Sequence, residues 1–159
     1  MYLNKRKAIF LISILLLVFF LTINDIKSQE LKVIDGDTIH LNGKKIRFTG
    51  IDSPELKQTC IKDGVEKPCG LTSKQLLINK IGNNNVECIS QGRDQYKRIL
   101  AECFVNNESL SSYLVISGYA FAFRKYSKKF VKDEDYAKVN SLGMWSMKFE
   151  YPWNYRKNN

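Results

Sequence analysis

Four acidic side chains and one arginine are closely spaced in a single run, VIDGDTIHLNGKKIRFTGIDSPE. Asp35 and Asp37 flank a glycine, Asp52 and Glu55 flank a Ser-Pro pair, and Arg47 lies between the two acidic pairs. Carboxylate oxygens are the ligands that hard divalent cations prefer, and a guanidinium can bind two oxygens of an anion at once. The run therefore indicates an active-site hairpin.

A tight turn at Asn42-Gly43 is the strongest local signal in this run, because both residues tolerate the positive φ of a type I′ turn. It predicts that the strand from Asp37 to Leu41 pairs with the strand from Lys44 to Phe48. The second strand continues to Ile51 and ends at Asp52, where the following proline favours a turn.

The register of this hairpin places Thr38 opposite Arg47 and leaves Asp37 nominally on the other face of the sheet. Asp37 can reach Arg47 only if the chain bulges at Gly36, or if the sheet curves enough to re-aim the side chain. We therefore expect a structural reason for a glycine at position 36.

The remaining chain predicts further short strands and helices. Its aromatic tail, which includes Trp145, Tyr151 and Trp153, is expected to pack over one end of the fold. The pattern indicates an α+β fold, mainly β, with a five-stranded OB-type Greek-key barrel and about three helices. The expected elements are a hairpin of 86–90 and 98–105, a last strand at 119–123, and helices at 71–81, 109–117 and 133–142.

The N-terminus has the layout of a secretory signal peptide or a membrane anchor. Three basic residues at 5–7 precede an uncharged apolar run at 8–23. This predicts a leader at residues 1–30 and one folded domain at 31–159. Cleavage and retention both remain open, so the protein is expected to be periplasmic, extracellular or anchored facing outward.

The chain is basic, with a formal net charge of +9 over 159 residues. Such a charge favours polyanionic partners, although a solvated lysine-rich surface would give the same count. A basic run at 124–132 includes Tyr126 and Phe130, a composition suited to phosphate contact and base stacking or, alternatively, to a solvated loop.

Four cysteines, at positions 60, 69, 88 and 103, follow the expected leader. An even number in a small exported domain indicates disulfides, with three possible pairings. Local spacing favours Cys60 with Cys69 and Cys88 with Cys103. A zinc site is disfavoured because the chain has no Cys-x-x-Cys pair and a single histidine.

Several of these motifs together resemble the staphylococcal-nuclease (thermonuclease-like) family. They are IDGDT at 34–38, IRFTGIDSPE at 46–55 and YKR at 96–98, and the resemblance covers about residues 31–156. An exported, disulfide-containing subgroup is similar in PCG at 68–70, GYAFAFRKYS at 118–127, GMW at 143–145 and YPWNYR at 151–156.

The resemblance implies a calcium site and a set of catalytic residues. Asp37 and Asp52 would be calcium ligands, Ser53 would be a ligand through its backbone carbonyl, and Asp35 would lie near the metal. The implied catalytic residues are Arg47, Glu55 and Arg98, with the two arginines binding phosphate and Glu55 beside the attacking water.

The resemblance also implies substrate contacts and an activity. Tyr126, Tyr96 and Lys97 would contact the nucleic acid, although many relatives have glycine at the position of Lys97. The implied reaction is calcium-dependent hydrolysis of phosphodiester bonds in DNA or RNA, leaving 3′-phosphate ends. The alternative is a non-catalytic nucleic-acid-binding OB module, tethered to a membrane through residues 8–23.

Overall fold

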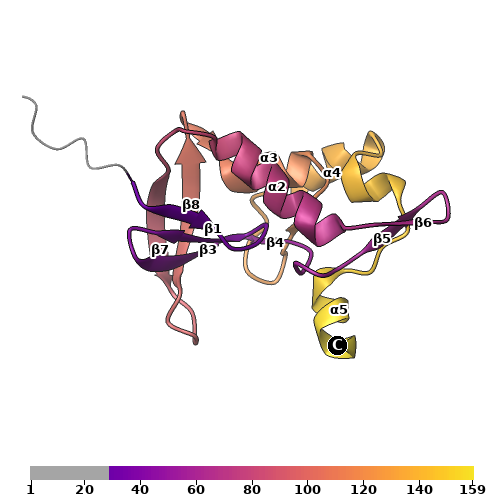
Figure 1. Cartoon of the computed structure of the whole chain (residues 1–159), viewed down its shortest axis with the longest axis horizontal. Helices are drawn as coiled ribbons and strands as arrows, with labels where there is room; N and C mark the ends of the chain where they lie inside the picture. The colour runs from indigo at the N-terminus through magenta and orange to yellow at the C-terminus, as the bar shows by residue number, and fades with distance from the viewer. Residues whose placement is uncertain (1–28) are drawn as a thin grey trace, which may run out of the picture.

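The computed structural model describes residues 29–159. The apolar run at 8–23, and the expected leader up to residue 28, lie outside the described residues. None of the helices within 29–159 combines the length and the apolar composition that crossing a bilayer requires. Figure 1 shows the main strands gathered at one side of the molecule and helices α2, α3 and α4 packed beside them.

The main sheet has the strand order β1-β2-β3-β8-β7, with the short β9 added beside β8. Neighbouring strands are antiparallel except β3 and β8, which run parallel. This confirms the predicted α+β class with a five-stranded OB-type sheet. The strands are β1 Leu31–Val33, β2 Thr38–Leu41, β3 Lys44–Phe48, β7 Glu87–Arg93, β8 Ile99–Val105 and β9 Glu108–Ser109.

Two small sheets complete the fold. β4, Ile51–Asp52, pairs with β10, Phe121–Ala122, so that Asp52 lies opposite Phe121. β5, Cys60–Lys62, and β6, Val65–Lys67, form a hairpin within the polar cysteine loop, where the sequence predicted no strands. Figure 1 shows this hairpin projecting from the side of the molecule opposite to the main sheet.

The helices near residues 71–81, 109–117 and 133–142 are confirmed. They are α2 Cys69–Ile81, α3 Leu110–Ile116 and α4 Val131–Val139, followed by a short 3₁₀ helix, η1, at Gly143–Ser146. The Ser109 side chain caps α3 by accepting a hydrogen bond from the backbone N–H of Ser112. A further helix, α5 Pro152–Asn158, was not predicted, although proline suits its first turn.

The first hairpin has the predicted turn and register. Asn42 and Gly43 have φ values of 50° and 73°, as a type I′ turn requires, and Thr38 pairs with Arg47. The pairing of β2 with β3 has no register shift, so the expected bulge at Gly36 is absent from this ladder. The chain instead bends over residues 35–37, immediately before β2.

Gly36 is required at this bend by a close approach. A Cβ atom at this position would lie 2.1 Å from Ser73 Oγ and 2.7 Å from Ser53 Oγ, closer than non-bonded atoms can lie. The bend therefore packs directly against the start of α2 and the chain after β4. This close packing is the structural reason for a glycine at position 36.

Two apolar clusters support these elements. The larger lies between the sheet and the helices and includes Ile39, Phe48, Leu77 and Leu114, each at most 1% exposed. The smaller surrounds Phe121, whose ring lies 5.3 Å from Trp145 and 5.0 Å from Tyr151, measured between ring centroids. The predicted packing of the aromatic tail over one end of the fold is thus confirmed.

Both predicted disulfides are formed. Cys60 pairs with Cys69 and Cys88 with Cys103, and the described residues contain no free cysteine. The second bridge joins residues that lie directly opposite each other in β7 and β8. Both bridges therefore connect segments that are already close in the fold.

Removing the β7–β8 disulfide with the double substitution Cys88→Ala and Cys103→Ala should lower the free energy of unfolding by about 3 kcal/mol, because it frees a short loop in the unfolded chain. Urea unfolding followed by circular dichroism measures this difference. An unchanged midpoint would show that this bridge does not stabilise the fold.

Candidate active site

The site is built around a guanidinium held between two buried carboxylates. Arg47 Nη1 lies 2.5 Å from Asp37 Oδ1, and Arg47 Nη2 lies 2.7 Å from Asp52 Oδ1. The carboxylate side chains are 4% and 0% exposed, whereas the arginine is 19% exposed. The predicted convergence of these three residues is therefore observed, and it takes place at the wall of a cleft.

Local backbone structure positions the two acids. Asp37 ends the bend before β2, and its Oδ2 accepts a hydrogen bond of 2.9 Å from the backbone N–H of Ser53. The Thr38 hydroxyl donates to Asp37 Oδ1 at 3.1 Å, and Asp35 Oδ1 accepts from the backbone N–H of Asp37 at 3.0 Å. Asp52 is the last residue of β4, which β10 holds in place. The acids thus depend on two separate strand ends.

The pKa of Asp37 is raised to about 7. Burial is the main cause, Arg47 opposes it, and the neighbouring carboxylates of Asp35 and Asp52 raise the pKa further. The pKa of Arg47 is also raised, because its two carboxylate partners outweigh the effect of burial. Around Arg47, the three carboxylates of Asp35, Asp37 and Asp52 outnumber the single guanidinium.

Arg156 is a residue of this site that the sequence analysis did not identify. Its Nη2 lies 2.7 Å from Asp52 Oδ2, and its Nη1 lies 2.8 Å from Glu55 Oε1 and 3.2 Å from Asp52 Oδ1. These contacts raise the pKa of Arg156 despite partial burial. The run YPWNYR pointed to this position only as part of a motif, and no local signal in it indicated contact with the acids.

Gln58 fixes the turn that carries Glu55 and was also missed. Its side-chain oxygen accepts from the backbone N–H of Glu55 at 3.1 Å, and its side-chain nitrogen donates to the Glu150 carbonyl at 2.6 Å. Gln58 is 1% exposed, so both contacts are shielded from water. At Gly70, a Cβ atom would lie 1.8 Å from the Glu55 carbonyl oxygen, which shows how closely α2 approaches the same turn.

Arg98 reaches the site from the connection between β7 and β8. Its Nε donates to Asp94 Oδ2 at 2.6 Å, and its backbone N–H donates to Asp94 Oδ1 at 2.9 Å. Desolvation raises the pKa of Asp94, but the hydrogen bonds from Arg98 outweigh it, so this pKa is lowered. Within residues 29–159, Arg98 forms no ion pair with the central acids.

One cleft of about 1090 Å³ joins these groups. Its lining includes most of the predicted site residues, namely Asp35, Asp37, Arg47, Ser53, Glu55, Tyr96, Arg98 and Tyr126, together with Arg156. Tyr96 and Tyr126 are 71% and 73% exposed and so have ring faces available to a ligand. Asp52 lies behind the cleft wall, fully buried.

Lys97 is a predicted substrate-contacting residue that does not line the cleft. Its backbone carbonyl accepts a hydrogen bond from Arg93, and its φ of 65° lies in the left-handed region that favours glycine. This conformation explains why glycine would suit the position. The turn conformation, and not a contact in the cleft, therefore determines the position of Lys97.

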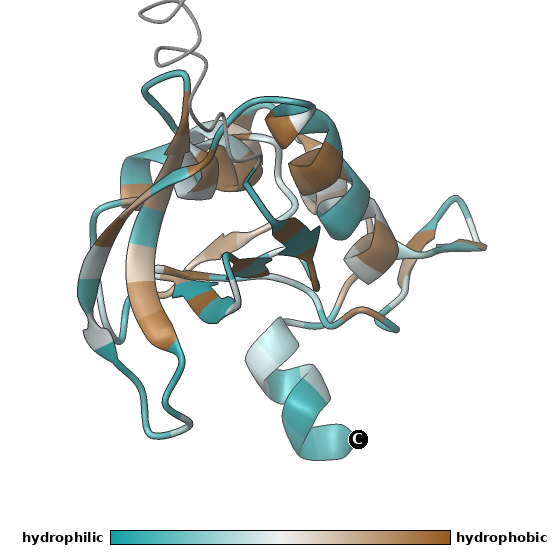
Figure 2. Ribbon diagram, turned by 60° about the vertical axis from the view of Figure 1, so that its left-hand side comes forward, coloured by the Kyte–Doolittle hydropathy of each residue, from teal (hydrophilic) through white to brown (hydrophobic). Residues whose placement is uncertain are grey.

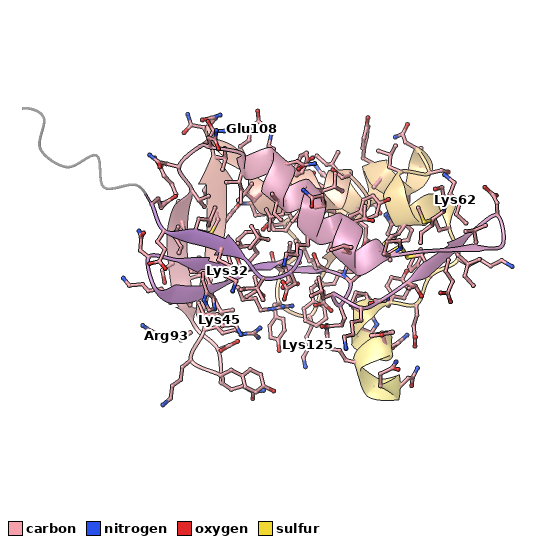
Figure 3. The ribbon with its side chains drawn as sticks, in the orientation of Figure 1. Lys32, Lys45, Lys62, Arg93, Glu108 and Lys125 are labelled. Atoms are coloured by element: carbon pink, nitrogen blue, oxygen red, sulfur yellow. A yellow bond between two sulfur atoms is a disulfide. The ribbon has the colours of Figure 1, made fainter. Side chains whose placement is uncertain are left out.

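Further cations lie around the cleft. Lys45, Arg93 and Lys129 are among the lining residues. Figure 3 shows Lys45 and Arg93 near one another below the main sheet, with Lys125 farther along the same side of the molecule. The cleft lining thus carries both basic and acidic side chains, and one of its cations, Lys129, is paired with Glu102.

The donor set at the base of the cleft suits a hard cation. Asp37, Asp52 and the backbone carbonyl of Ser53 offer oxygen atoms only, the donor type that hard cations prefer. The described part of the chain has no cluster of three or more His, Cys, Asp or Glu side chains already arranged as metal ligands.

The sequence was compared with known proteins. A family model described as "Staphylococcal nuclease homologue" matches residues 45–147. A "Probable staphylococcal-like nuclease CAN3" from rice is 32% identical over 116 residues, which is 71% of this chain and 28% of the rice protein. The chain thus spans less than a third of that relative.

Two bacterial relatives are covered more fully. An "Uncharacterized endonuclease" from Haemophilus influenzae is 28% identical over 149 residues, which is 86% of this chain and 78% of the relative. "Endonuclease YncB" from Bacillus subtilis is 33% identical over 129 residues, 72% of this chain and 59% of the relative.

The raised pKa of Asp37 makes a prediction for the metal-free protein. In the folded protein Asp37 keeps its proton up to about pH 7, whereas in the unfolded chain it loses the proton at about pH 4. Its favourable contribution to the free energy of unfolding should therefore be present below pH 4 and be lost as the pH rises to 7. Asp37→Asn should therefore raise the free energy of unfolding at pH 8 by roughly 1–4 kcal/mol and have less effect at pH 4.

Urea unfolding in the presence of chelator at both pH values measures this effect. The control is Asp135→Asn, which removes one carboxylate from the exposed face of α4. A loss of stability at pH 8 on Asp37→Asn would contradict the raised pKa.

Proposed function

The chain belongs to the family of staphylococcal nuclease homologues, and we propose that it is a calcium-dependent endonuclease. It hydrolyses phosphodiester bonds of DNA or RNA and leaves 3′-phosphate ends. The observation that carries this proposal is the buried pair of carboxylates, Asp37 and Asp52, joined by the guanidinium of Arg47, which lines the cleft.

Calcium would be held by Asp37, Asp52 and the backbone carbonyl of Ser53, with Asp35 close by. When bound there, calcium would polarise a phosphoryl oxygen and favour the attack of water. The backbone N–H of Ser53 donates to Asp37 Oδ2, so the segment that would present the Ser53 carbonyl is already tied to the first aspartate.

The two predicted catalytic arginines would bind the scissile phosphate. Arg47 is preorganised, because both of its terminal nitrogens are held by carboxylates at the cleft wall. Arg98 is oriented through its Nε by Asp94, and both residues line the cleft. Guanidinium groups match two phosphate oxygens and neutralise the charge that builds on them in the transition state.

Glu55 is the proposed proton acceptor for the attacking water. Its side chain is 40% exposed at the cleft, whereas Asp37 and Asp52 are buried, so Glu55 is more accessible to solvent than either aspartate. The turn that carries it is fixed by Gln58. A carboxylate in this position can hold a water molecule and take its proton as the water attacks phosphorus.

The nucleic-acid strand would extend along the cleft rim. Tyr96 and Tyr126 offer exposed rings for stacking with bases, and Lys45, Arg93 and Lys129 can pair with flanking phosphates. Lys97 would meet the strand outside the cleft, from the turn that it shares with Tyr96. Such contacts bind the backbone without reading its sequence.

The nuclease domain would comprise residues 31–159, preceded by a leader that directs export. The two disulfides fit an oxidising compartment, because such bridges form and persist outside the cytosol. The leader, residues 1–30, would be a signal peptide or an outward-facing membrane anchor.

Replacing the proposed proton acceptor tests this function. Purified protein should degrade plasmid DNA with calcium and stop with chelator, and Glu55→Gln should lower kcat about 10²–10⁴-fold, because the glutamine cannot accept a proton. Glu66→Gln, in the exposed β5–β6 hairpin, is the matched control and should cleave as the wild type does.

A gel assay of plasmid cleavage, with DNA binding measured in parallel by fluorescence anisotropy, separates the two function classes. Binding without cleavage by the wild-type protein in calcium would contradict the nuclease assignment and favour the binding module.

A further inference from the structure

Arg156 makes contacts that differ from those of an ordinary surface ion pair. Its guanidinium bridges Asp52 and Glu55 through three contacts of 2.7–3.2 Å. The Asp52 side chain is 0% exposed, so one end of the bridge is shielded from water. Removing Arg156 would leave the buried Asp52 with one cationic partner, Arg47, which it shares with Asp37.

The charges of the site explain why a second cation is needed. Arg47 is shared by Asp37 and Asp52, so one positive charge faces two buried carboxylates. Arg156 supplies the second positive charge and also pairs with Glu55. In this arrangement both oxygens of Asp52 are bound to guanidinium nitrogens.

The helix that carries Arg156 is attached mainly at its start. The Trp153 ring stacks on Tyr151 at 4.5 Å and on Phe123 at 5.8 Å, and the Glu150 carbonyl is held by Gln58. Figure 2 shows α5 as a largely hydrophilic helix standing apart from the other helices, with the C-terminus at its far end. Beyond its first turn, α5 is held by Arg156 and by a hydrogen bond of 2.6 Å that the Asn158 side chain donates to the Glu150 carboxylate.

We propose that Arg156 is the internal counter-cation of this site, which neutralises Asp52 and Glu55 and is displaced from Asp52 when a divalent cation binds. This proposal rests on the proposed function, because it takes the acids of the nuclease site as the ligands. It assigns to the C-terminal helix a role in metal loading.

Arg156 and a calcium ion would compete for one oxygen of Asp52. A calcium ion binds carboxylate oxygens at about 2.3–2.6 Å. Arg156 Nη2 already lies 2.7 Å from Asp52 Oδ2, so a calcium ion bound at this oxygen would lie close to the guanidinium. Repulsion between a guanidinium and a divalent ion at such a distance also favours release. Once Arg156 has left, Glu55 is freed from its partner and can hold water.

A purely structural role for Arg156 makes a different prediction. If the bridge only anchors α5, its loss should lower stability and leave calcium affinity unchanged. If Arg156 competes with calcium, its loss should raise the affinity, because the ion no longer has to break the bridge.

The test uses the full chain and calcium alone, without nucleic acid. Isothermal titration calorimetry should show that Arg156→Ala binds calcium about tenfold more tightly than the wild type, the change expected for removal of about 1.4 kcal/mol of competition. Lys157→Ala removes the same charge from the same helix but no contact with the acids, and it should change the affinity less than about twofold. Arg156→Lys, which keeps the charge but loses the two-pronged contact, should lie between the wild type and Arg156→Ala.

Hydrogen–deuterium exchange of residues 152–158 provides the second readout. Calcium should speed exchange of this helix in the wild type and have no such effect in Arg156→Ala, where the bridge is already absent. Equal calcium affinities in wild type and Arg156→Ala, or weaker binding by the variant, would overturn the proposal, as would unchanged exchange in the wild type.

Nuclease assays separate this proposal from the proposed function. If the wild type cleaves DNA with calcium but Arg156→Ala binds calcium no more tightly than the wild type, the proposed function stands. The proposed role of Arg156 as counter-cation would then be wrong. A failure of both proteins to bind calcium would overturn the calcium site itself together with the inference.

Discussion

The site depends on one constraint, the burial of Asp37 and Asp52 beside a single shared guanidinium. Buried carboxylates are unfavourable unless they are paired and hydrogen-bonded, so every neighbouring element has to supply a partner. Strand β3 supplies Arg47, the segment after β4 supplies the Ser53 N–H, and helix α5 supplies Arg156. The fold brings these three partners to the start of β2, next to Asp37, and to the end of β4, where Asp52 lies.

Close backbone approaches make this arrangement possible. Gly36 lets the bend before β2 lie against Ser53 and Ser73, and Gly70 lets the start of α2 lie against the Glu55 carbonyl. The Cys60–Cys69 disulfide joins the start of β5 to the first residue of α2. The turn between Asp52 and Gln58 is thereby held from three directions, which gives the proposed catalytic groups fixed positions without a metal.

Local signals predicted a large part of this structure. The Asn42-Gly43 turn set the register of the first hairpin, and short spacings indicated both disulfides. The contact between Asp37 and Arg47 did not follow from the hairpin register, which alone places the two on opposite faces. Arg156 could not be predicted, since its partners lie about a hundred residues earlier and are reached only through the packing of aromatic rings on Phe121 and Phe123. Contacts that depend on long-range packing leave no periodic pattern in the sequence.

Identification of the product ends tests the central claim most directly. A short single-stranded DNA incubated with the protein and calcium would be analysed by mass spectrometry, with a chelator-treated reaction beside it. We expect fragments that carry 3′-phosphate and 5′-hydroxyl ends, formed only with calcium and only when Asp37, Asp52 and Arg47 are intact. Fragments with 5′-phosphate ends, or cleavage that persists in chelator, would contradict it.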